Sequence, residues 1–269
     1  MTGRVLIVAG SDSGGGAGIQ GDLKTVMALG GYGMTAITAL TAQNTQGVHG
    51  VHPVPEAFVQ LQMQVVLDDL GADAVKTGML GSAAMVRAVA EALRSWCASL
   101  PVVVDPVMVA KGGARLLDAD AVAAMVTELL PLATVLTPNV PEAEALTSLT
   151  ITDEDTALRA LDALLRLGVP GVLLKGGHLA GPVVRDWLAT AANVEVLERP
   201  RIDTRHTHGT GCTMASAVAT GLAQGMDLSA AVHRARGYVQ AAILAAPGFG
   251  AGHGPLGHAV TVDLGRLSG

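Results

Sequence analysis

Hydrophobic residues along this chain gather in short runs of Val, Leu, Ile and Ala, each bounded by Gly, Pro, Asp or Asn. Such runs are typical of strands buried on both faces of a parallel sheet. They predict strands at Val5–Ala9, Met34–Leu40, Ala74–Lys76, Val102–Val104, Thr134–Leu136 and Gly171–Leu174, with edge strands at Val183–Ala189 and Val194–Leu197.

Amphipathic stretches lie between most of these runs, with apolar residues recurring at three- and four-residue spacing. They predict helices at Glu56–Leu70, Ala83–Cys97, Ala119–Leu130, Thr156–Leu167, Gly211–Ala223 and Leu228–Ala245. Because strand and helix alternate, we expect an α/β fold with a doubly wound, mostly parallel sheet and helices on both faces. No internal repeat or long linker divides the chain, so residues 1–269 are expected to form a single domain.

Composition narrows the functional classes. Half of the residues are hydrophobic and 15% are charged, which supplies a buried core. The net charge of -6 and the absence of Lys and Arg clusters argue against a nucleic-acid partner. Only Cys97 and Cys212 are present, and no apolar run is long enough to span a membrane, so we expect a soluble cytoplasmic protein.

Polar and glycine-rich segments follow the predicted strands, where open α/β sheets bind their ligands. They are Gly10–Gly18, Thr41–Thr45, Lys76–Met79, Asp105–Gly113, Thr137–Glu142 and Lys175–His178. Of these, Gly10–Gly18 and the later stretch Lys111–Ala114 are interpreted as mobile covers that exclude water. Their convergence at one edge predicts a binding site there.

A formal dinucleotide-binding pattern lies in the first of these segments, at Gly16-x-Gly18-x-x-Gly21. A dehydrogenase places its glycines directly at the strand end and an acidic residue about 20 positions later. Here the strand ends at Ala9, and no Asp or Glu occurs between Asp22 and Glu56. A dehydrogenase is therefore a minor alternative, and a plain flexible loop is another.

The segment His208–Thr213 leads directly into a predicted helix. Its Gly209, Thr210 and Gly211 leave backbone N–H groups open at a helix N-terminus, which suits an anion or a transferred phosphoryl group. A thiol near a helix N-terminus has a lowered pKa, so we interpret Cys212 as a thiolate base toward a substrate hydroxyl. The alternative is that Cys212 is a small buried apolar residue.

Several motifs in their order along the chain resemble hydroxymethylpyrimidine/phosphomethylpyrimidine kinases, of the ribokinase-like superfamily. They are Ala9–Gln20, Thr41–Thr45, Val75–Leu80, Asp105–Met108, Thr137–Asn139, Lys175–His178 and His208–Thr213. The resemblance implies a three-layer αβα kinase fold. It also implies phosphorylation of the hydroxymethyl group of 4-amino-5-hydroxymethyl-2-methylpyrimidine, and then of the resulting monophosphate, with ATP and Mg²⁺. The resemblance further implies a homodimer.

The same resemblance assigns the substrate-binding residues. Gln43 would pair its amide with the amino and ring-nitrogen edge of the pyrimidine, and Asp22 would be a second polar contact. The pocket walls would be Gly10, Ala17, Met79 and Val107. Without the resemblance, Met79 and Val107 would be interpreted as ordinary core residues.

The metal and phosphate residues also follow from the resemblance. Asn139 and Glu142 match an Asn-x-x-Glu metal element, Asp105 is a second magnesium candidate, and Lys175 would face the transferred phosphates. Alternatively, Glu142 stabilises the first turn of a helix and Lys175 is a strand-end lysine. The roles of His206 and His208 stay open. The rival functions are a pyridoxal kinase and a non-catalytic pyrimidine-binding sensor.

Overall fold

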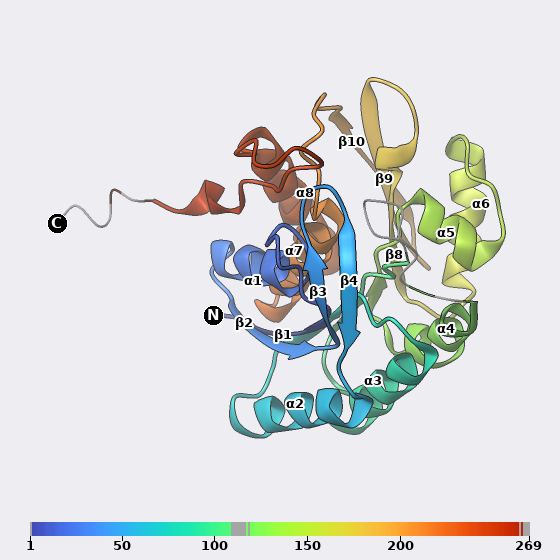
Figure 1. Ribbon diagram of the computed structural model, residues 1–269. Coiled ribbons are helices and arrows are strands. Elements are labelled where there is room, and N and C mark those ends of the chain that lie inside the picture. The colour runs from blue at the N-terminus through green and yellow to red at the C-terminus, as the bar shows by residue number, and fades with distance from the viewer. Residues whose placement is uncertain (1, 109–116, 118, 264, 266–269) are drawn as a thin grey trace.

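The computed structural model describes residues 2–108, 117, 119–263 and 265 of the chain. Within these residues, one sheet of eight strands forms the centre of the molecule (Figure 1). In spatial order the strands are β10 (Val194–Pro200), β9 (Val183–Thr190), β8 (Gly171–Lys175), β7 (Val135–Leu136), β6 (Val102–Val104), β5 (Ala74–Thr77), β1 (Arg4–Ala9) and β2 (Tyr32–Ile37).

Strands β2, β1, β5, β6, β7 and β8 pair in parallel, whereas β9 and β10 pair antiparallel at one edge. The parallel pairing confirms the prediction of a mostly parallel sheet. It also places the carboxyl ends of β1, β5, β6, β7 and β8 along one edge, so the segments that follow these strands lie near one another.

Side chains of successive strand residues alternate between the two faces of the sheet. In β1, Leu6 and Val8 enter the core beneath one helix layer, and Val5 and Ile7 enter the core beneath the other. The first layer contains α2 (Glu56–Asp69), α3 (Ala83–Trp96), α4 (Ala119–Ala124), α5 (Val140–Thr147) and α6 (Glu154–Leu165). The second contains α1 (Gly18–Ala28), α7 (Thr210–Ala223) and α8 (Leu228–Leu244). The three-layer fold expected from the sequence is confirmed.

Local sequence signals explain several helix starts. Asn139 begins α5 and Asp153 begins α6, each through a capping box in which the side chain accepts the backbone N–H three residues later. Because Asp153 caps α6, that helix starts before the predicted Thr156. The predicted Ala119–Leu130 helix is α4 continued by a π-helical turn at Met125–Leu129.

The predicted strand Met34–Leu40 is wrong in one respect, because it is two strands. At Thr38 the chain turns: its N–H bonds to Ala9 O, and its hydroxyl donates to Met79 O at 2.7 Å. Strand β3 (Ala39–Gln43) then leaves the main sheet and pairs with β4 (Val48–Pro53) as a separate antiparallel ribbon (Figure 1). The β4 strand was not predicted, because its sequence has no apolar run.

Helix α1 was also missed, because glycines occupy its first turns and are unfavourable inside helices. Its inner side is nevertheless buried against α7 and β1, so tertiary packing outweighs the low propensity. Among the described helices, none combines the length and apolar character that a membrane crossing requires.

Candidate functional site

A cleft of about 1150 Å³ opens at the carboxyl ends of the parallel strands. This volume exceeds the range of about 300–1000 Å³ that is usual for one small-molecule site, so the cleft has room for two ligands. The predicted site residues that line it are Gly10, Ala17, Gln43, Met79, Asp105, Val107, Asn139, Glu142, Lys175, Gly209, Thr210, Gly211 and Cys212. The structure thus brings together residues from both ends of the chain.

The N-terminus of α7 faces this cleft. Gly209 has a φ of +86°, and a Cβ at this position would lie 1.9 Å from Gly16 O, so only glycine fits. The first hydrogen bond within the helix runs from Thr213 N–H to Gly209 O, at 2.9 Å. The N–H groups of Gly211 and Cys212 precede it and are the open donors of a helix start. This arrangement can hold an anion.

Positive charge lies next to that helix start. A Cβ at Gly211 would be 3.3 Å from Lys175 Nζ and 3.9 Å from Asp105 Oδ2. Both side chains therefore face the open N–H groups of Gly211 and Cys212, which are called the cradle below. Lys175 Nζ donates to Asp105 Oδ1 at 3.0 Å. Burial lowers the pKa of Lys175, but the negative charges of Asp105 and Glu142 outweigh it and raise that pKa overall. Lys175 is therefore a cation at neutral pH.

Two buried carboxyl groups, Asp105 and Glu142, stand on the wall beside Lys175. Burial, followed by the charge of Asp105, raises the pKa of Glu142 to about 7, against the lowering effect of Lys175. Glu142 Oε2 accepts the Asn139 N–H at 2.8 Å, and Asn139 Oδ1 accepts the Glu142 N–H at 2.9 Å. Both alternatives for Glu142 therefore coexist in the geometry, since it caps α5 and also faces the cleft.

Asp105 and Glu142 can bind Mg²⁺ if water and phosphate oxygens complete its coordination shell. Among the residues that the structure describes, no cluster of three or more His, Cys, Asp or Glu side chains could enclose a metal ion. Magnesium often binds through one or two carboxylates and completes its shell with water and phosphate oxygens. Asp105 and Glu142 are suited to that mode, and the repulsion that raises the pKa of Glu142 would be relieved by a cation. The Asn139 side-chain oxygen is already engaged by the helix cap.

Cys212 is only partly exposed, and its pKa departs from expectation. Burial raises the pKa of Cys212 to about 12, and the negative charges of Asp22 and Asp105 add to that increase. Lys76 and the N–H of Gly18, which bonds to the sulfur, lower the pKa but do not compensate. The predicted lowering of the Cys212 pKa is therefore wrong, because desolvation exceeds the effect of the helix terminus.

Asp22 differs from the other predicted residues, because it is fully buried and does not line the cleft. Lys76 Nζ donates to both of its carboxylate oxygens at 2.9 and 3.0 Å, and Ser216 Oγ donates to Oδ1 at 2.7 Å. Burial lowers the pKa of Lys76, but the Asp22 carboxylate and nearby negative groups raise it overall, so the ion pair persists. As the structure stands, a direct contact of Asp22 with a substrate is blocked by its own partners.

The opposite end of the cleft carries Gln43, with Gly10, Ala17, Met79 and Val107 as its neighbours on the wall. A Cβ at Gly10 would lie 2.4 Å from Met79 Cε, so this methionine packs directly on the loop after β1. The amide of Gln43 is the polar group among these small and apolar neighbours. This end of the cleft can therefore hold a small flat ring with one polar edge.

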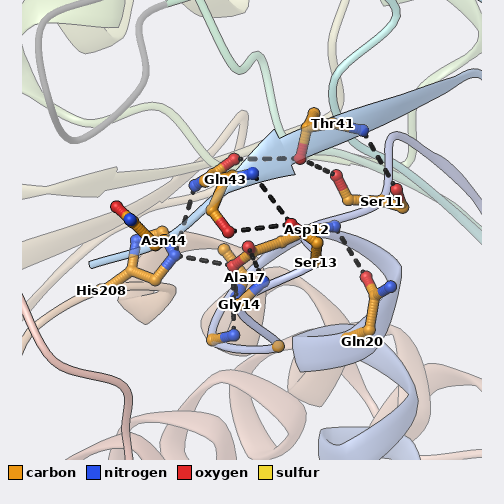
Figure 2. Close-up of polar contacts among 12 residues, drawn as sticks. Ser11, Asp12, Ser13, Gly14, Ala17, Gln20, Thr41, Gln43, Asn44 and His208 are labelled. Atoms are coloured by element: carbon orange, nitrogen blue, oxygen red, sulfur yellow. Dashed lines mark hydrogen bonds and ion pairs between the residues drawn. The ribbon is translucent and has the colours of Figure 1, made fainter. Parts of the chain in front are cut away.

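Asp12 and His208 form a buried pair next to Gln43 that the sequence did not reveal. His208 Nε2 lies 2.7 Å from Asp12 Oδ2 (Figure 2). Asp12 also accepts the N–H groups of Gly14, Gly16 and Ala17, so one carboxylate organises the whole glycine loop. These contacts fix the loop as a wall of the cleft and do not support its interpretation as a mobile cover. The other proposed cover, residues 111–114, lies outside the described residues.

The glycines of the dinucleotide pattern have a structural purpose here. A Cβ at Gly16 would lie 2.5 Å from the His208 ring, and one at Gly18 would lie 2.5 Å from Gly10 O. Protein atoms therefore occupy the space that a dinucleotide would need, which argues against the dehydrogenase alternative.

His206 is not on the cleft, and its buried Nδ1 has no hydrogen-bond partner among the described residues.

The lining of the cleft also includes residues 199–204, at the end of β10 and just beyond it, and Val239, Gln240 and Ile243 of α8. Arg199 donates to Gln240 Oε1 at 2.5 Å across this region. In the sheet, β8 with Lys175 lies between β10 and β1, whose following loop bonds to Gln43, so a group could pass near Lys175 between ligands bound toward either edge.

Comparisons with known proteins agree with this geometry. The profile of the phosphomethylpyrimidine kinase family matches residues 12–257. A Streptomyces coelicolor protein named hydroxymethylpyrimidine/phosphomethylpyrimidine kinase is 52% identical over 254 residues, which cover 94% of this chain and 93% of that protein. The thiamine biosynthesis bifunctional protein ThiED of Geobacter sulfurreducens is 54% identical over 261 residues. That match covers 97% of this chain but only 53% of the Geobacter protein.

Among solved structures, the ADP complex of Bacillus subtilis pyridoxal kinase superposes with a TM-score of 0.90. It is 36% identical in sequence, and the match covers 97% of this chain and 98% of that chain. The fold is thus that of the ribokinase-like kinases, as expected. The match to the family profile, together with high identity over nearly the whole chain, shows that this chain belongs to the phosphomethylpyrimidine kinase family.

Proposed function

We propose that this protein transfers the γ-phosphoryl group of ATP to the hydroxymethyl group of 4-amino-5-hydroxymethyl-2-methylpyrimidine, and then to the monophosphate so formed, for thiamine biosynthesis. One observation carries the proposal: the open helix start at Gly211 faces Lys175 and Asp105 in one cleft that has room for two ligands. This is where a phosphoryl group in transit would carry its charge.

Each residue has a defined task in this proposal. Gln43 binds the polar edge of the ring, while Met79 and Val107 enclose its faces. The N–H groups of Gly211 and Cys212 and the ammonium of Lys175 stabilise the transferred group, and alignment supplies most of the rate. Thr210 and Gly209 shape the cradle at the start of α7.

Asp105 and Glu142 would hold Mg²⁺ directly or through its waters. When bound, the ion would neutralise phosphate charge. Asn139 supports this site by positioning Glu142 through the cap. Asp22 acts on Cys212 and not on the magnesium site, because it fixes the Lys76 ammonium whose charge lowers the pKa of that thiol.

Cys212 is proposed to accept the proton of the substrate hydroxyl. Because burial raises its pKa, the sulfur is mostly a thiol at neutral pH, and it can act as a base only in the ionised fraction. If the thiolate is to contribute, ligand binding has to raise the ionised fraction of Cys212. Lys76 is the nearby positive charge that favours the thiolate.

The first alternative is a pyridoxal kinase, which the similarity to the Bacillus subtilis structure favours. The second is a pyrimidine sensor without catalysis, which the combination of Lys175, Glu142 and Cys212 in one cleft disfavours. Product formation from the pyrimidine, its monophosphate and pyridoxal, each with Mg-ATP, tests all three. Turnover of pyridoxal alone would favour the first alternative, and pyrimidine binding without ATP consumption would favour the second.

We further propose a single kinase domain, a homodimer and a cytoplasmic location. The net charge of -6 and the small-molecule cleft support a protein without nucleic-acid partners. Sedimentation of the purified chain would test the dimer.

A further inference from the structure

The orientation of the Gln43 amide can be worked out from its neighbours. Gln43 Nε2 lies 3.4 Å from His208 Nε2, and Gln43 Oε1 lies 3.4 Å from Thr41 Oγ1 (Figure 2). The oxygen and nitrogen of an amide have nearly the same shape, so hydrogen-bond partners decide which is which. The backbone is already fixed, because Gln43 N–H donates to Ser13 Oγ and Ser13 Oγ–H donates to Gln43 O, both at 2.8 Å.

His208 presents an N–H edge and no acceptor to this amide, because the one hydrogen on its Nε2 is directed to Asp12. Its Nε2 lies 2.7 Å from Asp12 Oδ2, an oxygen that also accepts the N–H groups of Gly16 and Ala17. Burial raises the pKa of Asp12, but the His208 bond and the backbone N–H groups outweigh it and lower that pKa overall. Asp12 is thus an ionised acceptor, and His208 Nε2 must carry a hydrogen. Gln43 Nε2, also a donor, cannot bond to it.

Thr41 presents an acceptor at the other end of the amide. Its hydroxyl has one hydrogen, which it donates to Ser11 O at 2.9 Å. Toward Gln43 the Thr41 oxygen therefore has only lone pairs. An amide oxygen at this position would meet another acceptor, whereas an amide N–H would be satisfied. Both ends of the amide lead to the same conclusion.

We propose that the Gln43 amide works with Oε1 toward His208 and Nε2 toward Thr41, held in this order by the Asp12–His208 pair. This inference rests on the proposed function. It makes Asp12, His208 and Thr41 positioning residues that set substrate specificity through Gln43. A bound ring must then offer its donor on the His208 side and its acceptor on the Thr41 side.

The proposed substrate has this order of donor and acceptor, and the order places its hydroxymethyl group on the side of the cradle. Its amino group is the donor and its adjacent ring nitrogen is the acceptor. The hydroxymethyl group is attached to the ring carbon next to the one that carries the amino group, so it lies on the His208 side. His208 directly precedes Gly209, the cap of α7. The fixed amide therefore directs the reacting hydroxyl toward the cradle, while the reverse amide would direct it away.

The test compares two ligands that present opposite orders of donor and acceptor. These are 4-amino-5-hydroxymethyl-2-methylpyrimidine and its 4-oxo analogue, which has a carbonyl and a ring N–H in the corresponding places. Dissociation constants are measured by calorimetry without nucleotide. The parent should prefer the amino compound, and His208→Phe, which removes the N–H that keeps the amide nitrogen away, should lower that preference about threefold. His208→Gln, which retains an N–H donor, should preserve most of the preference.

Thr41→Val acts on the other end of the amide and should lower the preference by about threefold, so it decides the matter if His208→Phe does not fold. Equal weakening of both ligands, with an unchanged preference, would overturn the inference and leave His208 a structural role. Nitrogen NMR of the parent at neutral pH should find His208 Nε2 protonated, and a bare Nε2 would also overturn it. A parent that binds neither pyrimidine would instead contradict the proposed function.

Discussion

The raised pKa of Cys212 has a consequence that can be measured on the free protein. Alkylation of a cysteine requires the thiolate, so its rate reports the ionised fraction. The pKa of Cys212 is raised from 9.0 to about 12 by burial and by the charges of Asp22 and Asp105. We therefore expect Cys212 to react slowly when no ligand is added, despite its place at a helix N-terminus.

The size of the effect follows from two opposing factors. Three pKa units reduce the thiolate fraction about 1000-fold, since each unit is a factor of ten. A more basic thiolate is a better nucleophile, and a Brønsted coefficient of about 0.4–0.5 returns about 15- to 30-fold. The net expectation is an alkylation rate about 30- to 60-fold below that of an unperturbed thiol, before any loss from restricted access.

The assay uses a Cys97→Ser background, so that only Cys212 can react. Cys97 is 2% exposed in the core and remote from the cleft, which makes this change a suitable control. Iodoacetamide modification is followed by mass spectrometry from pH 6 to pH 10, beside a cysteine peptide. We expect the rate to rise about tenfold per pH unit over this range without a plateau.

A plateau above pH 7 or 8 would refute this reasoning and restore a thiolate stabilised by the helix terminus. Turnover gives an independent measure of the role of Cys212. Cys212→Ser should lower the single-turnover rate by about 100-fold, the lower end of the effect of a general base, with substrate binding largely kept. A parental rate in this variant would exclude Cys212 as the base.

The remaining predictions concern Gln43, Glu142 and Lys76. Gln43→Ala should lower kcat/KM for the pyrimidine by about 10- to 100-fold, because a buried polar edge of the ring loses its partner, and unchanged kinetics would remove Gln43 from the site. Glu142→Gln should raise the Mg²⁺ concentration needed for half-maximal activity, while an identical titration would assign Glu142 to the helix cap alone. The pKa of Glu142 is about 7 when folded against 4.5 when unfolded, so the proton binds the folded state more tightly. Relative to Glu142→Gln, the parent should therefore lose stability as pH rises from about 4.5 to about 7, as urea unfolding would show. Lys76→Met should lower the free energy of unfolding by about 3–5 kcal/mol by leaving the buried Asp22 carboxylate without its cation, and Lys76→Met with Asp22→Leu should recover much of it.

The family motifs located the part of the cleft around Gln43, Lys175 and the start of α7, but not residues 199–204 or the α8 residues that also line it. Glycine and polar residues after apolar strands predicted where Lys175, Asp105 and Gln43 would meet, because parallel strands end at one edge of a sheet. The contacts that these side chains make in the fold were harder to predict from the sequence. Asp22 was predicted as a substrate contact, yet it is fully buried under Lys76 and Ser216. No local pattern marks a carboxylate whose partners come from other elements.

The pairing of Asp12 with His208 was not predicted from the sequence, for the same physical reason. Asp12 and His208 are 196 positions apart, and their pairing exists only because the loop after β1 packs against the start of α7. The missed α1 likewise gains its stability from burial against α7, which its glycine-rich sequence does not predict.

The sequence by itself determined the alternation of strands and helices, the order of the motifs and the family, because these depend on periodicity and on residue type along the chain. Only the tertiary structure decided the protonation of Cys212 and the donor order around Gln43. Both depend on desolvation and on charges within a few ångströms, such as those of Asp105 and Asp12. A helix start lowers the pKa of a thiol in water, but the surrounding protein reverses the sign by removing that water.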